Sequence, residues 1–153
     1  MKIKDIMNRD VISVERDTPV DEIAHLLIEN DIGGVPVVNE ERRVIGIVNE
    51  SDLFLKEKGM PFSAVKAPML FEQWVQPEKL LEIYAEAHLH TAADVMTGPV
   101  ICVEEQDTIP NVAMLMARHD VKHVPVVRDE KLVGMVTRLD IIRFLALKGK
   151  EKR

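Results

Sequence analysis

Two stretches of this chain repeat one pattern of residues. Residues 20–38 read VDEIAHLLIENDIGGVPVV and residues 109–127 read IPNVAMLMARHDVKHVPVV, so that Pro36 and Pro125 stand 89 positions apart (125 − 36). Upstream the same interval separates Asp5 from Asp94 and Met7 from Met96. Downstream, after the loss of one turn residue, the interval is 88, in the pairs Gly46/Gly134 and Asp52/Asp140. A repeat of this length is usually a supersecondary block that buries its apolar face against its own copy. We therefore expect two pseudo-symmetric blocks with a cleft between them.

The composition narrows the class of protein. A length of 153 residues, with 46% apolar and 30% charged residues, is typical of a compact globular domain with its own core. The net charge of −6 argues against a nucleic-acid or membrane-surface role, because both need a basic face. Cys102 is the one cysteine, and the first ten residues lack the apolar stretch of a signal peptide. These features predict a cytoplasmic protein that binds neither nucleic acid nor membrane.

Each copy predicts the order strand, helix, strand, strand, helix. In the first copy the β-branched residues 11–14 form a strand, and apolar residues then recur at the spacing of one helix face. These residues are Val20, Ile23, Ala24 and Leu27, and in the second copy Ile109, Val112, Ala113 and Met116. Gly33 and Gly34 are expected to end the first helix, because glycine adopts the left-handed conformation without steric cost.

Two short strands follow each of these helices. They are predicted over residues 35–38 and 44–48 in the first copy and over residues 124–127 and 132–136 in the second. Their nearly continuous apolar character indicates that both faces are covered. The proline in the first strand of each pair removes a backbone donor, which predicts that this strand is an edge strand or is irregular at the proline.

The repeats set the predicted domain limits at residues 1–58 and 91–148, with a basic tail over 149–153. Residues 59–90 have no copy and are too apolar for a flexible linker. Within them PEKLLEIYAEAHL predicts a helix that begins at Pro77 and turns Leu80, Leu81, Tyr84 and Ala87 inward. We therefore expect a helical inter-repeat segment over residues 59–90.

The sharpest local motif lies where the last strand of each copy meets its second helix. Residues 134–140 read GMVTRLD and residues 46–52 read GIVNESD. Thr137 and Asp140 have the spacing of a capping box, in which each side chain bonds a backbone amide of the helix start. Asn49 is an equally good cap in the first copy. This explanation accounts for the spacing without any ligand.

Three motifs occur together: D-h-M and h-P-V-V, which are present in both copies, and the G-h-h-[ST]-x-x-D of residues 134–140. In this combination the chain resembles the CBS domain family in its tandem form, the Bateman module. The fold that the resemblance implies is mixed α/β (α+β). It consists of two pseudo-symmetric β-α-β-β-α CBS repeats packed through their sheets, with the helical segment between them.

The resemblance implies an adenosine-nucleotide sensor. In such proteins the motif aspartate binds the ribose hydroxyls and the preceding Thr or Ser contacts ribose or phosphate, which Asp140, Thr137 and Asp52 match. A carboxylate suits a vicinal diol and a helix start suits a phosphate. Asn49 departs from the Ser or Thr of this pattern. The adenine would lie against the strand residues Val35, Pro36, Val37, Val124, Pro125 and Val126, with Ile12 and Ser13.

Charge distinguishes the two predicted clefts. Lys122, His123 and Arg138 surround the second motif, whereas Gly33, Gly34 and Glu50 hold the equivalent positions of the first. The second copy alone offers cations for phosphates at these positions. The alternative is a solvated, basic helix end. We expect one good site near Asp140, and a first cleft that is empty or prefers a less anionic ligand.

Other chemistry is poorly supported by the sequence. The histidines and Cys102 form neither a Cys-x-x-Cys nor a His-Glu-x-x-His pattern, and no nucleophile–base arrangement or P-loop is recognisable. We therefore expect no enzyme, no metal and no cofactor other than an adenine nucleotide as ligand, AMP or ATP before ADP. The resemblance also implies a homodimer, and an unknown protein partner regulated in trans. The alternatives are a ligand-free structural or dimerisation module, an S-adenosylmethionine sensor, and an enzyme acting on the nucleotide.

Overall fold

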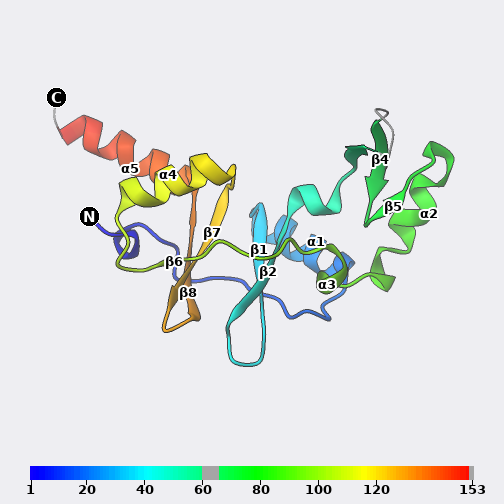
Figure 1. Ribbon diagram of the computed structural model, residues 1–153, viewed down its shortest axis with the longest axis horizontal. Coiled ribbons are helices and arrows are strands. Elements are labelled where there is room, and N and C mark those ends of the chain that lie inside the picture. Colours follow the sequence, from blue (N-terminus) through cyan, green and yellow to red (C-terminus); the bar gives the residue numbers. More distant parts are fainter. Residues whose placement is uncertain (60–65, 152–153) are drawn as a thin grey trace. The chain divides into compact units, whose positions relative to one another are not determined.

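The computed structural model describes residues 1–59 and 66–151, and the chain divides into two compact units (Figure 1). Unit 1 comprises Met1–Ile12, Glu40–Val44 and Ile101–Arg153, and unit 2 comprises Ser13–Asn39 and Ile45–Val100. Each unit thus joins the body of one repeat to the opening segment of the other repeat. The units in space therefore follow a different division of the chain from the predicted limits at residues 1–58 and 91–148.

Unit 1 is a three-stranded sheet beside two helices. Strand β6 (Val103–Glu104) pairs in parallel with β7 (His123–Arg128), which pairs antiparallel with β8 (Lys131–Thr137). Helices α4 (Ile109–His119) and α5 (Arg138–Glu151) lie next to each other along this sheet (Figure 1). The predicted strands 124–127 and 132–136 are confirmed. Residues 149–151 of the predicted tail continue α5, whereas Lys152 and Arg153 lie outside the described residues.

Strand β7 is the central strand of this sheet, so the edge alternative is wrong for it, whereas its pairing with β8 is irregular next to Pro125, with a register shift between Val126 and Val127, as the other alternative predicted. Pro125 stands opposite Met135, whose backbone N–H and C=O both bond to Asn8 instead, at 2.9 Å each. The missing donor of Pro125 therefore falls where β8 directs its own polar groups away from β7. Asn8 belongs to the opening segment of the first repeat, which borders β8.

The opening segment also contributes to the core of unit 1. Ile3 is completely buried and Met7 is nearly so, next to side chains from the second repeat. The core also includes the predicted α4 stripe residues Ile109, Val112 and Met116, which are all buried as expected for one helix face. Hydrophobic burial thus links residues that are about a hundred positions apart in the chain.

Unit 2 contains helix α1 (Val20–Glu29), the two-stranded sheet β1 (Gly34–Val38) and β2 (Val44–Asn49), and a short helix α3 (Ala92–Val95). On α1 the predicted stripe is confirmed, because Val20, Ile23 and Leu27 are buried. Residues 90–93 close the start of this helix: the amide of Val20 donates to the carbonyl of His90 at 2.9 Å. The opening of the second repeat therefore completes the unit that holds the first.

An aspartate in the left-handed conformation follows both α1 and α4. Asp31 has a φ of 49° and Asp120, at the equivalent position, a φ of 51°. No glycine among the described residues has a positive φ, so the role predicted for Gly33 and Gly34 is wrong. Aspartate tolerates this conformation because its short polar side chain bonds locally.

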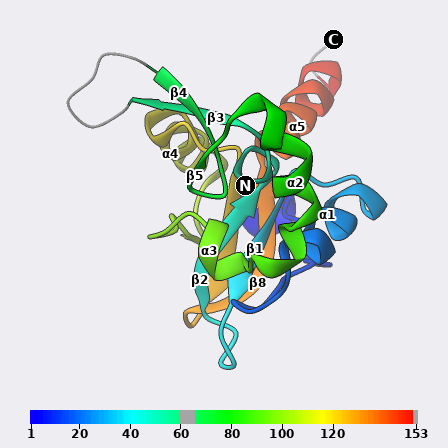
Figure 2. The same cartoon turned by 90° about the vertical axis from the view of Figure 1, so that its right-hand side faces the viewer.

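The second half of unit 2 departs from the predicted repeat. After β2 the chain makes only a 3-10 turn (Glu50–Leu53) where α5 stands in unit 1, because Phe54 already has extended dihedral angles. A three-stranded antiparallel sheet follows, formed by β3 (Lys56–Gly59), β4 (Lys66–Leu70) and β5 (Gln73–Trp74), as Figure 2 shows. The predicted strand over residues 11–14 is reduced to one bridge between Val14 and Val37.

The inter-repeat segment is thus part sheet and part helix, and not purely helical as predicted. Pro77–Leu89 divides into a 3-10 turn, helix α2 (Leu80–Ala85) and a second 3-10 turn. Leu80 and Ala87 pack inward with Ile83, whereas Leu81 is 81% exposed. The predicted inward face assumed one continuous helix, whereas α2 ends at Ala85 and a 3-10 turn follows it. Among the described helices, none combines the length and apolar character needed to cross a membrane.

Candidate functional site

Both strand-end motifs form the predicted capping boxes. In unit 1 the Asp140 carboxylate accepts from the amide of Thr137 at 2.8 Å, and the Thr137 hydroxyl accepts from the amide of Asp140 at 3.2 Å. In unit 2 the Asp52 carboxylate accepts from the amide of Asn49 at 2.7 Å. The capping explanation is therefore confirmed in both copies. Each box leaves the second carboxylate oxygen of its aspartate for another partner.

The predicted basic residues of the second copy gather at one end of β7 and β8. His123 stands opposite Thr137, and the amide of Arg138 donates to the carbonyl of Lys122 at 3.1 Å. In unit 2 the amide of Glu50 makes the equivalent bond to Gly33 at 3.0 Å. The structure thus brings Lys122, His123, Thr137 and Arg138 together at the motif of Asp140.

Arg138 is held by the turn between α4 and β7. Its guanidinium donates to the Asp120 carboxylate at 2.8 Å and to the carbonyl of Val121 at 3.1 Å. The hydrogen bond from Arg138, together with its positive charge, lowers the pKa of Asp120 below its ordinary value. Arg138 therefore ties the turn to the start of α5, and its contact with a ligand stays a prediction.

The six strand residues predicted to contact adenine form the middles of β1 and β7. Val35, Val37, Val124 and Val126 are completely buried, and Pro36 and Pro125 are buried beside them. Their side chains fill the cores of the two units and have little surface left for a ligand. Ile12 and Ser13 are half-buried; Ile12 ends a segment of unit 1 and Ser13 begins one of unit 2.

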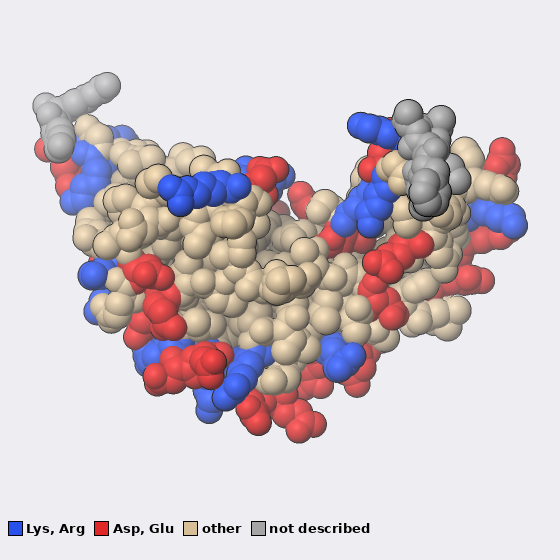
Figure 3. Space-filling model, viewed as in Figure 1, with Lys and Arg blue, Asp and Glu red and all other residues tan. Residues whose placement is uncertain are grey.

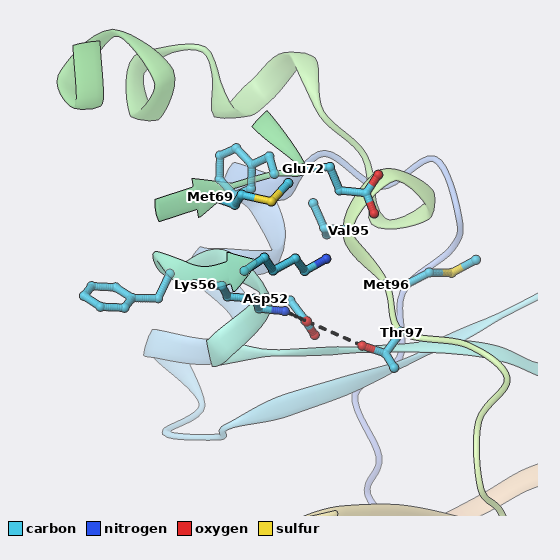
Figure 4. Close-up of a pocket in the computed structure, with 10 residues that line it drawn as sticks. Asp52, Lys56, Met69, Glu72, Val95, Met96 and Thr97 are labelled. Carbon is cyan, nitrogen blue, oxygen red and sulfur yellow. Dashed lines mark hydrogen bonds and ion pairs between the residues drawn. The ribbon is translucent and has the colours of Figure 1, made fainter. Parts of the chain in front are cut away.

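A pocket of about 130 Å³ lies beside Asp52, within unit 2 (Figure 4). Asp52 is 6% exposed, and its Oδ1 accepts from Lys56 Nζ at 2.5 Å and from the Thr97 hydroxyl at 3.4 Å. In Figure 4 Met69 and Glu72 lie on the side of the pocket away from Thr97. The remaining lining residues are Phe54, Lys58, Phe71, Val95 and Met96. The volume is below the roughly 300–1,000 Å³ of ligand pockets in general, so it suits part of a nucleotide.

Sequence reasoning missed most of this pocket. Lys56 and Lys58 come from β3, and Met69 and Glu72 lie in or beside β4, in the stretch that has no second copy. Only the position of Lys56, four residues after Asp52, is a signal that the sequence offers. The prediction that only the second copy offers cations was limited to the equivalents of Lys122, His123 and Arg138. Lys56 and Lys58 bring cations to the pocket of the first copy from other positions.

The described residues include no group of three or more His, Cys, Asp or Glu side chains placed to hold a metal ion. Cys102 is half-buried, and this burial, followed by the charge of Glu104, raises the pKa of its thiol above the ordinary value. A thiol with a raised pKa is a poor nucleophile at neutral pH.

Comparison with known proteins relates the whole chain to one family. The family model of the CBS domain matches residues 3–58 and 92–147. An uncharacterized protein of Methanocaldococcus jannaschii, MJ1426, is 32% identical over 95% of this chain and 91% of its own length. Other curated relatives are longer, and the chain spans 32% and 62% of two of them.

Solved structures show the same fold. The CBS domain pair of protein MJ0100, in complex with 5'-methylthioadenosine and S-adenosyl-L-methionine, has a TM-score of 0.71 at 26% identity and covers 97% of this chain and 98% of its own. CBSX2 of Arabidopsis thaliana in complex with AMP has a TM-score of 0.71 at 24% identity, covering 97% and 98%. The predicted family and its mixed α/β fold are confirmed. With two matches to the CBS domain, the chain belongs to the CBS domain family as a tandem pair.

Proposed function

We propose that this chain is a regulatory module that binds an adenosine nucleotide, AMP, ADP or ATP, and acts on a separate protein without catalysis of its own. The observation that carries the proposal is the pair of capped aspartates, Asp52 and Asp140, each at the end of a CBS strand. Each keeps one oxygen, Oδ1, outside its capping box as an acceptor for a sugar hydroxyl, although at Asp52 a hydroxyl would have to displace Lys56 from that oxygen. The adenosine compounds bound by the domain pair of MJ0100 support this class of ligand.

The second motif supports a phosphorylated ligand. Among the described residues the ion-pair partner of Asp140 Oδ1 is the exposed Arg143, at 3.7 Å, and Lys122 and His123 lie at the same end of the sheet. A ribose on Asp140 would place a phosphate near these groups and the helix start. Regulation follows if the ligand binds one state of the module more tightly than another, because only this difference in affinity shifts the population of states.

Calorimetric titration with AMP, ADP, ATP and S-adenosylmethionine tests the proposal, beside an Asp140→Ala variant. We expect wild type to bind a phosphorylated compound and the variant to lose the site near Asp140. Thermal unfolding of the variant controls for loss of its cap. If wild type binds none of the four at millimolar concentration, the module is a structural one; if it binds S-adenosylmethionine alone, the alternative sensor is correct.

We also infer that two copies of the chain associate through helices. Leu139, Ile142 and Leu145 recur along α5 and are 52%, 59% and 61% exposed, with Met114 of α4 at 55%. Apolar side chains on neighbouring helices are typical of a subunit interface. Sedimentation velocity tests this: we expect a dimer for wild type and a monomer for Ile142→Glu, and a monomeric wild type contradicts it.

A further inference from the structure

The carboxylate that lines the pocket of unit 2 already has a cation. Asp52 Oδ1 and Lys56 Nζ are 2.5 Å apart, and the side chain of Asp52 is 4% exposed while that of Lys56 is 40% exposed. A charge-assisted hydrogen bond to a buried carboxylate is among the stronger polar interactions of a protein. Any sugar hydroxyl that approaches Asp52 Oδ1 therefore competes with Lys56.

The second repeat provides a natural comparison for this ion pair. Asp140 is equivalent to Asp52, and Phe144 stands where Lys56 does, 88 positions later. Phe144 packs against the core of unit 1, and the cation near Asp140 is Arg143, at 3.7 Å and 68% exposed. The two motif aspartates thus share a capping box but differ in the partner of their Oδ1 atoms.

Lys58 extends the positive charge of the pocket. It lies two residues after Lys56 on β3, so both side chains project to the same face of the strand. Both line the pocket, and among the described residues no carboxylate lies within ion-pair distance of Lys58. Lysine and carboxylate side chains are mixed around this sheet, as Figure 3 shows near β4. The pocket therefore offers two ammonium groups, one bound to Asp52 and one exposed.

We propose that Lys56 makes the Asp52 pocket selective for phosphorylated adenosine compounds over uncharged ones. In the empty pocket Lys56 occupies Asp52; when a nucleotide enters, the ribose takes Asp52 Oδ1, and the Lys56 ammonium turns to the phosphate, where Lys58 also pairs. An adenosine compound without phosphate breaks the same ion pair and leaves the displaced ammonium without an anion. This inference rests on the proposed function, and it reverses the expected preference of the first cleft.

The test uses the full-length chain with the other motif disabled by Asp140→Ala. AMP and 5'-methylthioadenosine, which lacks the phosphate, are titrated calorimetrically into this variant and into the same variant carrying Lys56→Met. We expect the Asp140→Ala variant to bind AMP at least about tenfold more tightly than 5'-methylthioadenosine. Adding Lys56→Met should remove most of this ratio of affinities. Lys131→Met, which removes an exposed lysine of β8, is the matched control and should leave the ratio unchanged.

Lys56→Met leaves the Asp52 carboxylate buried without its cation, so its folding is checked by thermal unfolding. If it does not fold, Lys56→Arg and Lys58→Met carry the test. Lys56→Arg keeps the charge and should keep the AMP preference, whereas Lys58→Met should weaken AMP severalfold and leave 5'-methylthioadenosine unaffected.

The outcomes separate this inference from the proposed function. Equal affinity for the two compounds in the Asp140→Ala variant overturns the role of Lys56, as does an unchanged ratio after Lys56→Met or Lys58→Met. If wild type binds AMP but the Asp140→Ala variant binds neither compound, the Asp52 pocket takes no such ligand and only this inference fails. If wild type binds no adenosine compound at all, both fail.

Discussion

The sulfur of Met7 lies 2.5 Å from the point where a β-carbon on Gly134 would stand. The equivalent pair in unit 2 is Met96 and Gly46, where the Met96 Cγ would be 2.8 Å from that β-carbon. Both distances are shorter than any ordinary contact between carbon or sulfur atoms. The methionine of each D-h-M motif thus covers the glycine of the last strand in the other repeat, which explains why both residues recur at the repeat interval.

Gly46→Ala and Gly134→Ala should therefore destabilise the protein by about 1–3 kcal/mol each through overpacking. The methionine chain is flexible, but the β-carbon of Gly134→Ala would also lie 3.1 Å from the backbone oxygen of Asn8, and that of Gly46→Ala 3.1 Å from Met96 Cβ, so neither site can relax by moving a side-chain end alone. Chemical denaturation measures the change. Combining Met7→Ala with Gly134→Ala should recover part of the loss, and a strictly additive double variant would contradict this explanation.

Ile3→Ala should destabilise unit 1 by about 2–5 kcal/mol, because it opens a cavity in a completely buried position. Ile3 is 0% exposed although it lies at the start of the chain. Ile28→Ala removes the same atoms from a side chain that is 79% exposed and should change stability by less than about 0.5 kcal/mol. Equal effects of the two substitutions on the denaturation midpoint would show that the opening segment does not belong to the core.

Thr137→Val should reduce stability by about 0.5–2 kcal/mol, since the Thr137 hydroxyl accepts from the amide of Asp140 at 3.2 Å. Thr137→Ser keeps that acceptor and should remain close to wild type. Measuring AMP affinity on the same proteins distinguishes capping from ligand contact. A Thr137→Val variant that unfolds at the wild-type temperature would argue against the capping role.

Lowering the pH should weaken the ion pair between Glu105 and Arg128. Arg128 donates to both carboxylate oxygens of Glu105, at 2.6 Å each, and this hydrogen bonding with the arginine's charge lowers the pKa of Glu105 below its ordinary value. A lowered pKa in the folded state contributes stability above the ordinary carboxyl pKa, which is lost as the pH falls through the folded value. Glu105→Gln should therefore be less stable than wild type at neutral pH, with the gap closing in acid. A constant gap in unfolding experiments from neutral pH to strong acid would contradict this.

The repeat was sufficient to predict much of the fold, because its pattern records burial that both copies need. The helix stripes of Val20 and Ile109, the paired strands and both capping boxes depend on residues close in sequence, whose side chains bond or bury locally. Interactions between residues this close in the chain can be recognised from the sequence alone. The family followed from the same matched residues.

The sequence by itself determined the two CBS repeats, the positions of Asp52 and Asp140, the strand that precedes each, and the helix that begins at Arg138. Tertiary structure alone decided which strands Asn8 and Thr97 would join, since pairing across such intervals depends on long-range contacts. It also decided that Lys56 would begin a strand and reach Asp52, where Phe144 continues a helix in the second copy. Two equivalent motifs thus acquired different partners because the stretch after Leu53 pairs with β4, an interaction for which the repeat contains no pattern.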